Sequence, residues 1–143
     1  MTLTRNRFLA SLSALFLGTT LAALAAPAQT KPEKPAHVSQ GQEVDIASMA
    51  VKGKTTIFDF TSEYCPPCKA VAPKLDKLHA SRSDIVVVKV DINRPGVKTI
   101  DWKSPVAAQY KLRSIPHFKV FGPDGKLKVE GDEAAEMVYG LLN

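Results

Sequence analysis

The apolar residues of this chain gather in short runs, and the spacing within each run predicts alternating strands and helices. Residues 55–60 and 85–92 are rich in β-branched and aromatic side chains, which favours two buried strands. Between these runs, Val71, Leu75 and Leu78 recur at helical spacing, which predicts an amphipathic helix. A strand, a helix and a second strand in this order indicate a βαβ unit with two parallel strands.

The second half of the chain predicts a set of shorter elements. Ser104 followed by Pro105 is typical of an N-cap and the first position of a helix. The Gly-Pro-Asp-Gly sequence at residues 122–125 is typical of a tight turn, so the runs that flank it are expected to pair as antiparallel strands. The whole pattern predicts an α/β fold with a mixed sheet. The additional elements are an edge strand at 43–46, a helical turn at 48–51, a helix at 104–110, strands at 117–121 and 126–130, and a last helix from Asp132.

The first 40 residues have a different composition from the rest. Arg5 and Arg7 precede an uncharged apolar run at 8–24, and Ala-Pro-Ala follows at 26–28, which predicts a signal peptide over residues 1–28. Cleavage after Ala25 also fits the pattern. The alternative is an uncleaved membrane anchor, although a run of 17 residues is at the short end for a span. We therefore expect a periplasmic or secreted protein.

The remainder of the chain predicts one domain after a linker. Residues 29–40 contain Pro32 and Pro35 and few apolar side chains, which predicts a flexible linker. Residues 41–143 have the common size of a single domain, and we expect a monomer. The net charge of the whole chain is +5, and most lysines stand singly. A nucleic-acid-binding protein concentrates its basic residues on one face, so no nucleic-acid partner is expected.

The two cysteines, Cys65 and Cys68, lie where the first predicted strand meets the first predicted helix. A helix N-terminus favours the thiolate, which is the reactive form of cysteine. A disulfide between residues so close in sequence closes a very small loop and adds little stability, so a purely structural role is the weaker interpretation. Soft thiolates also suit Cu(I), which leaves a copper-binding or copper-delivery module as the alternative. No resident metal site is predicted, because the three histidines lie far apart in the sequence.

Three segments together resemble the thioredoxin family. They are Asp-Phe-Thr-Ser-Glu-Tyr-Cys-Pro-Pro-Cys-Lys at 59–69, Lys-Val-Asp-Ile-Asn at 89–93 and Tyr-Lys-Leu-Arg-Ser-Ile-Pro-His-Phe at 110–118. The resemblance extends from about residue 55 to the end of the chain. It implies a thioredoxin-like three-layer α/β/α fold with a central mixed sheet of four to five strands. It also implies a thiol-disulfide oxidoreductase that exchanges disulfides with protein substrates and needs no cofactor. Together with the signal peptide predicted over residues 1–28, this predicts an exported oxidoreductase.

The resemblance also implies roles for the redox residues. Cys65 matches the attacking thiolate and Cys68 the resolving thiol, and we expect Cys65 to be the more exposed of the two. Asp59 matches a buried aspartate that moves a proton to and from the resolving cysteine, and Lys89 matches the partner of that aspartate. The alternatives are a solvated Asp59 at a sheet edge and a Lys89 whose amine reaches the surface. Two charged residues within two predicted buried strands favour the redox interpretation.

The expected substrate-binding residues surround the cysteines. Pro116 matches the cis-proline of the family, and the preceding Ile115 is expected to pair through its backbone with an incoming peptide. The other residues expected at this surface are Tyr64, Pro66, Pro67 and His117.

Departures from the family pattern make this chain a specialised relative. Thr61 and Tyr64 stand where thioredoxins commonly have tryptophans, and His117 stands where a small hydroxyl residue is usual. Relative to ordinary thioredoxins, residues 97–105 are expected to be an insertion of about nine residues. We expect Trp102 to pack this insertion, and the alternative is that it shapes the substrate face. Because Pro66 and Pro67 lack N–H donors, the thiolate should be less stabilised than in oxidising members, which favours a reductase. A reductase outside the cytosol requires a partner that supplies its electrons. We expect this electron donor, or an acceptor if the protein is an oxidase, to be a membrane protein.

Overall fold

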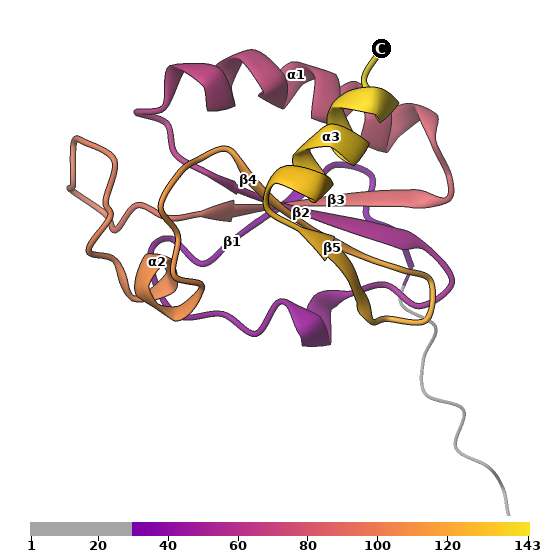
Figure 1. The fold of residues 1–143 in the computed structure, drawn as a ribbon, viewed down its shortest axis with the longest axis horizontal. Coiled ribbons are helices and arrows are strands. Elements are labelled where there is room, and N and C mark those ends of the chain that lie inside the picture. The colour runs from indigo at the N-terminus through magenta and orange to yellow at the C-terminus, as the bar shows by residue number, and fades with distance from the viewer. Residues whose placement is uncertain (1–29) are drawn as a thin grey trace, which may run out of the picture.

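The computed structural model describes residues 30–143, in which a five-stranded mixed sheet lies between two helical layers (Figure 1). This arrangement confirms the predicted fold class. The signal peptide predicted over residues 1–28 lies outside the described residues. The elements are β1 Ala36–Val38, η1 Ala47–Met49, β2 Thr55–Thr61, α1 Pro66–Ser81, β3 Ile85–Asp91, α2 Pro105–Gln109, β4 His117–Phe121, β5 Leu127–Glu130 and α3 Asp132–Leu141.

The two long apolar runs form the centre of the sheet. The strand order is β1-β3-β2-β4-β5, in which β2 and β3 are parallel and β4 runs antiparallel to both β2 and β5. Strands buried on both faces are typically near-continuous apolar runs, and the first six residues of β3 are all buried, with Lys89 the one charged residue among them. The predicted βαβ unit and the predicted hairpin are both present.

The helices divide into two layers that bury different faces of the sheet. Helices α1 and α3 cover one face, and α2 with the 3-10 helix η1 covers the other (Figure 1). Successive side chains of a strand point to opposite faces. Accordingly, Ile57 packs in the cluster that includes α1, whereas Phe58 and Phe60 pack in the cluster that includes α2. By the same alternation, Asp59 faces α1.

The edge strand lies earlier in the chain than we expected. Its residues, Ala36–Val38, pair in parallel with β3, so the prediction of a flexible linker over 29–40 is wrong for these three residues. The prediction of a strand at 43–46 is also wrong. Val44 instead bonds to side chains of the α2 region: its N–H donates to Gln109, and its carbonyl accepts from the hydroxyl of Tyr110. No helix among residues 30–143 is long and apolar enough to cross a bilayer.

A buried histidine fixes the segment that leads into β1. His79 on α1 accepts a hydrogen bond at Nδ1 from the backbone N–H of Val87, at 3.0 Å. Its Nε2 lies 2.9 Å from the carbonyl oxygen of Pro32 and donates to it, since Nδ1 is the acceptor. The ring therefore links α1, β3 and the N-terminal segment.

Candidate active site

The two cysteines form a disulfide at the N-terminal end of α1. Cys65 is the N-cap of the helix, and the backbone N–H of Cys68 donates to Cys65 Sγ at 3.2 Å. Pro66 and Pro67 occupy the first two helical positions, which tolerate proline because their N–H groups have no intrahelical partner. The local sequence thus begins the helix and places the disulfide at its first turn.

The disulfide lies under the loop that precedes β4. Cys65 and Cys68 are each only 1% exposed, so the expectation that Cys65 is the more exposed residue is wrong. The Sγ atom of Cys65 lies 3.7 Å from the carbonyl oxygen of Ile115, in the neighbouring loop. The Ile115–Pro116 bond is cis, as the resemblance implied. In this loop, Ile115 and Pro116 are themselves half-buried.

The other residues expected at the substrate surface are partly exposed. Pro66 and Pro67 are exposed at the start of α1, and Tyr64 is half-buried beside them. His117 is half-buried and stacks edge-on against Phe60, with 5.8 Å between ring centroids. Burial, together with the charge of Lys119, lowers the pKa of His117. This favours the neutral ring near neutral pH.

Asp59 is fully buried and lacks hydrogen-bond partners. Neither carboxylate oxygen has a partner among residues 30–143, and the side chain is 0% exposed, so the alternative of a solvated residue is wrong. Burial raises the pKa of Asp59 to about 7, although the charge of Lys89 opposes the shift. A carboxyl group with such a pKa can accept and release a proton near neutral pH.

Lys89 lies beside Asp59 in the sheet but pairs with another carboxylate. The two residues are register partners on β2 and β3. However, Nζ of Lys89 forms an ion pair with Asp76 on α1 at 2.5 Å, so the expected direct partnership with Asp59 is not observed. The position of α1 decides this outcome, because it brings Asp76 over the end of the lysine side chain. Lys89 therefore acts on Asp59 through its charge alone.

Comparisons with known proteins identify the family. The profile of the family described as Thioredoxin matches residues 39–141. The chain is 32% identical over 90 residues to Thioredoxin H3 of Arabidopsis thaliana, covering 62% of this chain and 69% of that protein. It is also 32% identical over 107 residues to Thioredoxin H-type of Brassica campestris, covering 74% and 80%. The crystal structure of thioredoxin f from spinach chloroplast (short form) shares the fold, with a TM-score of 0.54, 24% identity and coverage of 80% and 99%.

The chain belongs to the thioredoxin family. Membership of this family, together with the disulfide at the start of α1, shows that the protein is a thiol-disulfide oxidoreductase that acts on protein disulfides. Among residues 30–143, no three His, Cys, Asp or Glu side chains gather as metal ligands.

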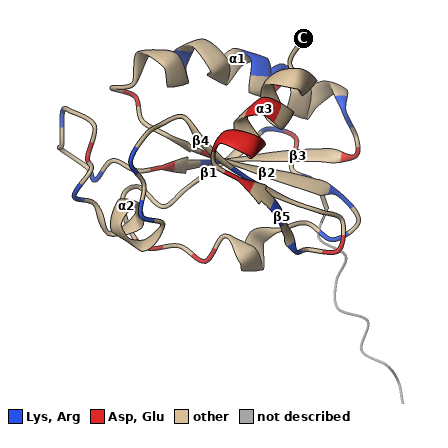
Figure 2. Cartoon of the chain, in the orientation of Figure 1, with Lys and Arg blue, Asp and Glu red and all other residues tan. Residues whose placement is uncertain are grey.

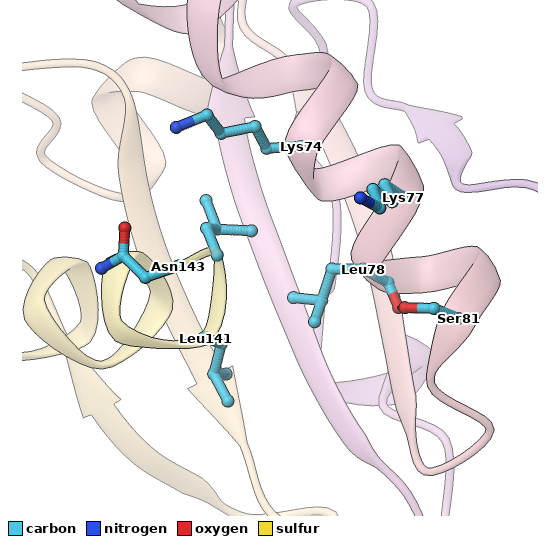
Figure 3. Close-up of a pocket in the computed structure, with 7 residues that line it drawn as sticks. Lys74, Lys77, Leu78, Ser81, Leu141 and Asn143 are labelled. Carbon is cyan, nitrogen blue, oxygen red and sulfur yellow. The ribbon is translucent and has the colours of Figure 1, made fainter.

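A cavity lies on the Cys68 side of this thioredoxin site. Its volume is about 190 Å³, and its lining includes Cys68, Lys89 and His37. His37 was missed by the sequence analysis because it lies in the segment expected to be a linker, whereas the structure places it opposite Lys89 in the sheet. A larger cavity of about 330 Å³ lies between the last turns of α1 and the C-terminal residues (Figure 3). It is at the opposite end of α1 from the disulfide, so we do not assign it to the redox site.

A second feature missed by the sequence analysis is a polar network beside the cysteines. The hydroxyl of buried Ser62 accepts from the N–H of Tyr64 and donates to Asn93 Oδ1 at 2.7 Å. The amide nitrogen of Asn93 donates in turn to the carbonyl oxygens of Val97 and Thr99. The network thus connects the loop before α1 to the residues that follow β3. No local pattern indicates it, because its members belong to two separate loops.

Proposed function

We propose that the protein is an exported protein-disulfide reductase. In its reduced form, the Cys65 thiolate attacks one sulfur of a client disulfide and displaces the other sulfur as a thiolate. Cys68 then attacks Cys65 Sγ, which releases the client's second thiolate and leaves the Cys65–Cys68 disulfide. Two electrons pass from the dithiol to the client. Asp59 takes the proton that Cys68 loses, which its raised pKa makes favourable near neutral pH.

The observation that supports reduction over oxidation is the hydrogen bonding of Cys65 Sγ. A helix N-terminus normally offers several free N–H groups. Here Pro66 and Pro67 have none, and the N–H of Cys68 is the backbone donor to this sulfur among residues 30–143. A less stabilised thiolate makes the dithiol a stronger reductant, since a strong oxidant requires a stabilised reduced form.

The predicted signal peptide over residues 1–28 supports export to the periplasm or the outside of the cell. Such compartments oxidise thiols, so repeated turnover needs a source of electrons from elsewhere. We propose a membrane protein as this electron donor. An electron acceptor would take its place if the protein worked as an oxidase. Detection of the processed chain in a periplasmic fraction would test the predicted export.

The reduction potential of the Cys65–Cys68 pair tests the direction. We expect a value near that of thioredoxin, about −270 mV, whereas a value near about −120 mV would refute the proposal. The variant Pro67→Ala restores an N–H at the second helical position, which can reach an N-cap side chain. Because a hydrogen bond to a charged group contributes roughly 1.5–3 kcal/mol, we expect the potential to rise by roughly 30–60 mV. Pro66→Ala is the matched control, since an N–H at the first position does not reach the cap.

Insulin reduction with dithiothreitol as electron donor tests the activity itself. We expect turnover in the unmodified protein and none in Cys65→Ser. The copper-binding alternative predicts the opposite result, with tight binding of Cu(I) and no turnover.

A further inference from the structure

The segment that connects β3 to β4, residues 92–116, concentrates positive charge at the disulfide end of the molecule. It contains five basic residues and one acidic residue, a net charge of +4. The other described residues contain 12 basic and 13 acidic side chains and are close to neutral. Figure 2 shows the basic positions spaced along this segment, on the left of the view. The net positive charge of residues 30–143 therefore comes from the segment 92–116.

The charges of this segment are available to a partner. Arg94 is neutralised by buried Asp101, with Nε and Oδ2 2.7 Å apart. The four remaining cations are exposed and have no carboxylate within 4.0 Å among residues 30–143. These cations are Lys98, Lys103, Lys111 and Arg113.

The inserted part of the segment is held in a defined position. Asn93 bonds to the Ser62 hydroxyl, two carbonyl oxygens of the insertion and the N–H of Asp101. The prediction that Trp102 is packed in the insertion is wrong, because this side chain is 43% exposed. A large apolar side chain held at the surface between cations is typical of a protein-binding site, where aromatic residues supply contact area at low entropic cost.

The same segment reaches the reacting sulfur. Its final residues include Ile115, whose carbonyl oxygen lies 3.7 Å from Cys65 Sγ. At its other end, Ser62 ties Asn93 to the loop that precedes the cysteines. Both ends of the segment therefore lie beside the disulfide, and Arg113 stands two residues before Ile115 in the sequence.

We propose that this basic rim, defined as Lys98, Trp102, Lys103, Lys111 and Arg113, docks client proteins that have acidic residues beside the target disulfide. The inference rests on the proposed reductase function and adds the class of its clients. Complementary charge raises the rate of encounter and orients the partner, and Trp102 adds an apolar contact. The partner is a protein rather than a nucleic acid or an anionic membrane, because the rim borders a disulfide whose reaction partners are thiols and disulfides.

The test compares two peptides that each contain the same disulfide loop. One has Asp and Glu on both sides of the loop, and the other has Lys and Arg. Reduced protein is mixed with each peptide, and the second-order rate constant is divided by that for hydroxyethyl disulfide, which is uncharged. Measurements at about 10 mM and about 300 mM salt vary the Debye length from about 30 Å to below about 10 Å.

We expect the acidic peptide to react roughly tenfold faster in low salt, with the preference shrinking in high salt. The double variant Lys98→Glu and Lys103→Glu should lose or invert the preference. The matched control, Lys52→Glu and Lys126→Glu, makes the same charge change at exposed positions at the opposite end of the sheet, and it should keep the preference. Equal rates for the two peptides, or the same preference in both double variants, would overturn the proposed docking. Failure to reduce hydroxyethyl disulfide and both peptides would overturn the reductase function as well.

Discussion

Replacing Asp59 with asparagine should change how the stability of the protein depends on pH. The folded protein binds the Asp59 proton more tightly than the unfolded chain, because burial raises this pKa from 3.8 to about 7. Stability due to this group is therefore greatest below about pH 4 and falls as the pH rises towards 7. One pKa unit corresponds to about 1.4 kcal/mol, so the loss amounts to about 4 kcal/mol above pH 7.

The assay is urea unfolding of oxidised wild-type protein and Asp59→Asn between pH 4 and pH 8. The difference in unfolding free energy should move in favour of the variant by roughly 3–4 kcal/mol across this interval. An asparagine amide without partners lowers stability by a constant amount, so the slope with pH is the informative quantity. Glu136→Gln, at an exposed position of α3, makes the same carboxylate-to-amide change at the surface and serves as the control. A constant difference between wild type and Asp59→Asn would contradict the reasoning.

Two further predictions concern the polar network beside the cysteines. Asn93→Ala leaves the buried Ser62 hydroxyl without its acceptor and should lower the unfolding free energy by roughly 2–3 kcal/mol, measured in urea; a change below about 0.5 kcal/mol would argue against the network. The hydrogen bond from the Arg94 guanidinium lowers the pKa of Asp101. The ionised Asp101 therefore contributes to the stability of the fold above the ordinary pKa of aspartate, and this contribution is lost as the pH falls through the lowered pKa. Trp102 is the single tryptophan, so an acid titration of its fluorescence should show this loss, and Asp101→Asn should remove that transition. An unchanged titration in the variant would be evidence against this role of the pair.

The central elements could be predicted because their signals are local. The apolar runs of β2 and β3 and the helical spacing of α1 each lie within one short stretch of sequence. The burial of Asp59 could be predicted for the same reason, since the carboxylate interrupts a run that has to be buried. The cis bond before Pro116 followed from the family resemblance and not from local physics.

The features that were missed depend on partners distant in sequence. β1 has three residues, and its pairing partners on β3 lie about 50 positions later, so its own sequence is uninformative. The ion pair between Lys89 and Asp76 depends on where α1 sits over the sheet. The burial of Cys65 depends on the loop that contains Ile115. In each case tertiary packing decides which of several chemically reasonable partners a side chain meets.

The ring of His79 also protects an edge of the sheet. An unpaired strand edge is a template for pairing with another copy of the chain. On β3, the three residues of β1 cover Val88, Lys89 and Val90, and the N–H of Val87 just before them is occupied by His79 Nδ1. The opposite edge is the four-residue strand β5, which contains Lys128. Coverage of the β3 edge thus depends on one imidazole and a three-residue strand. Loss of the segment that carries β1 would therefore leave this edge of β3 open to pairing with another chain.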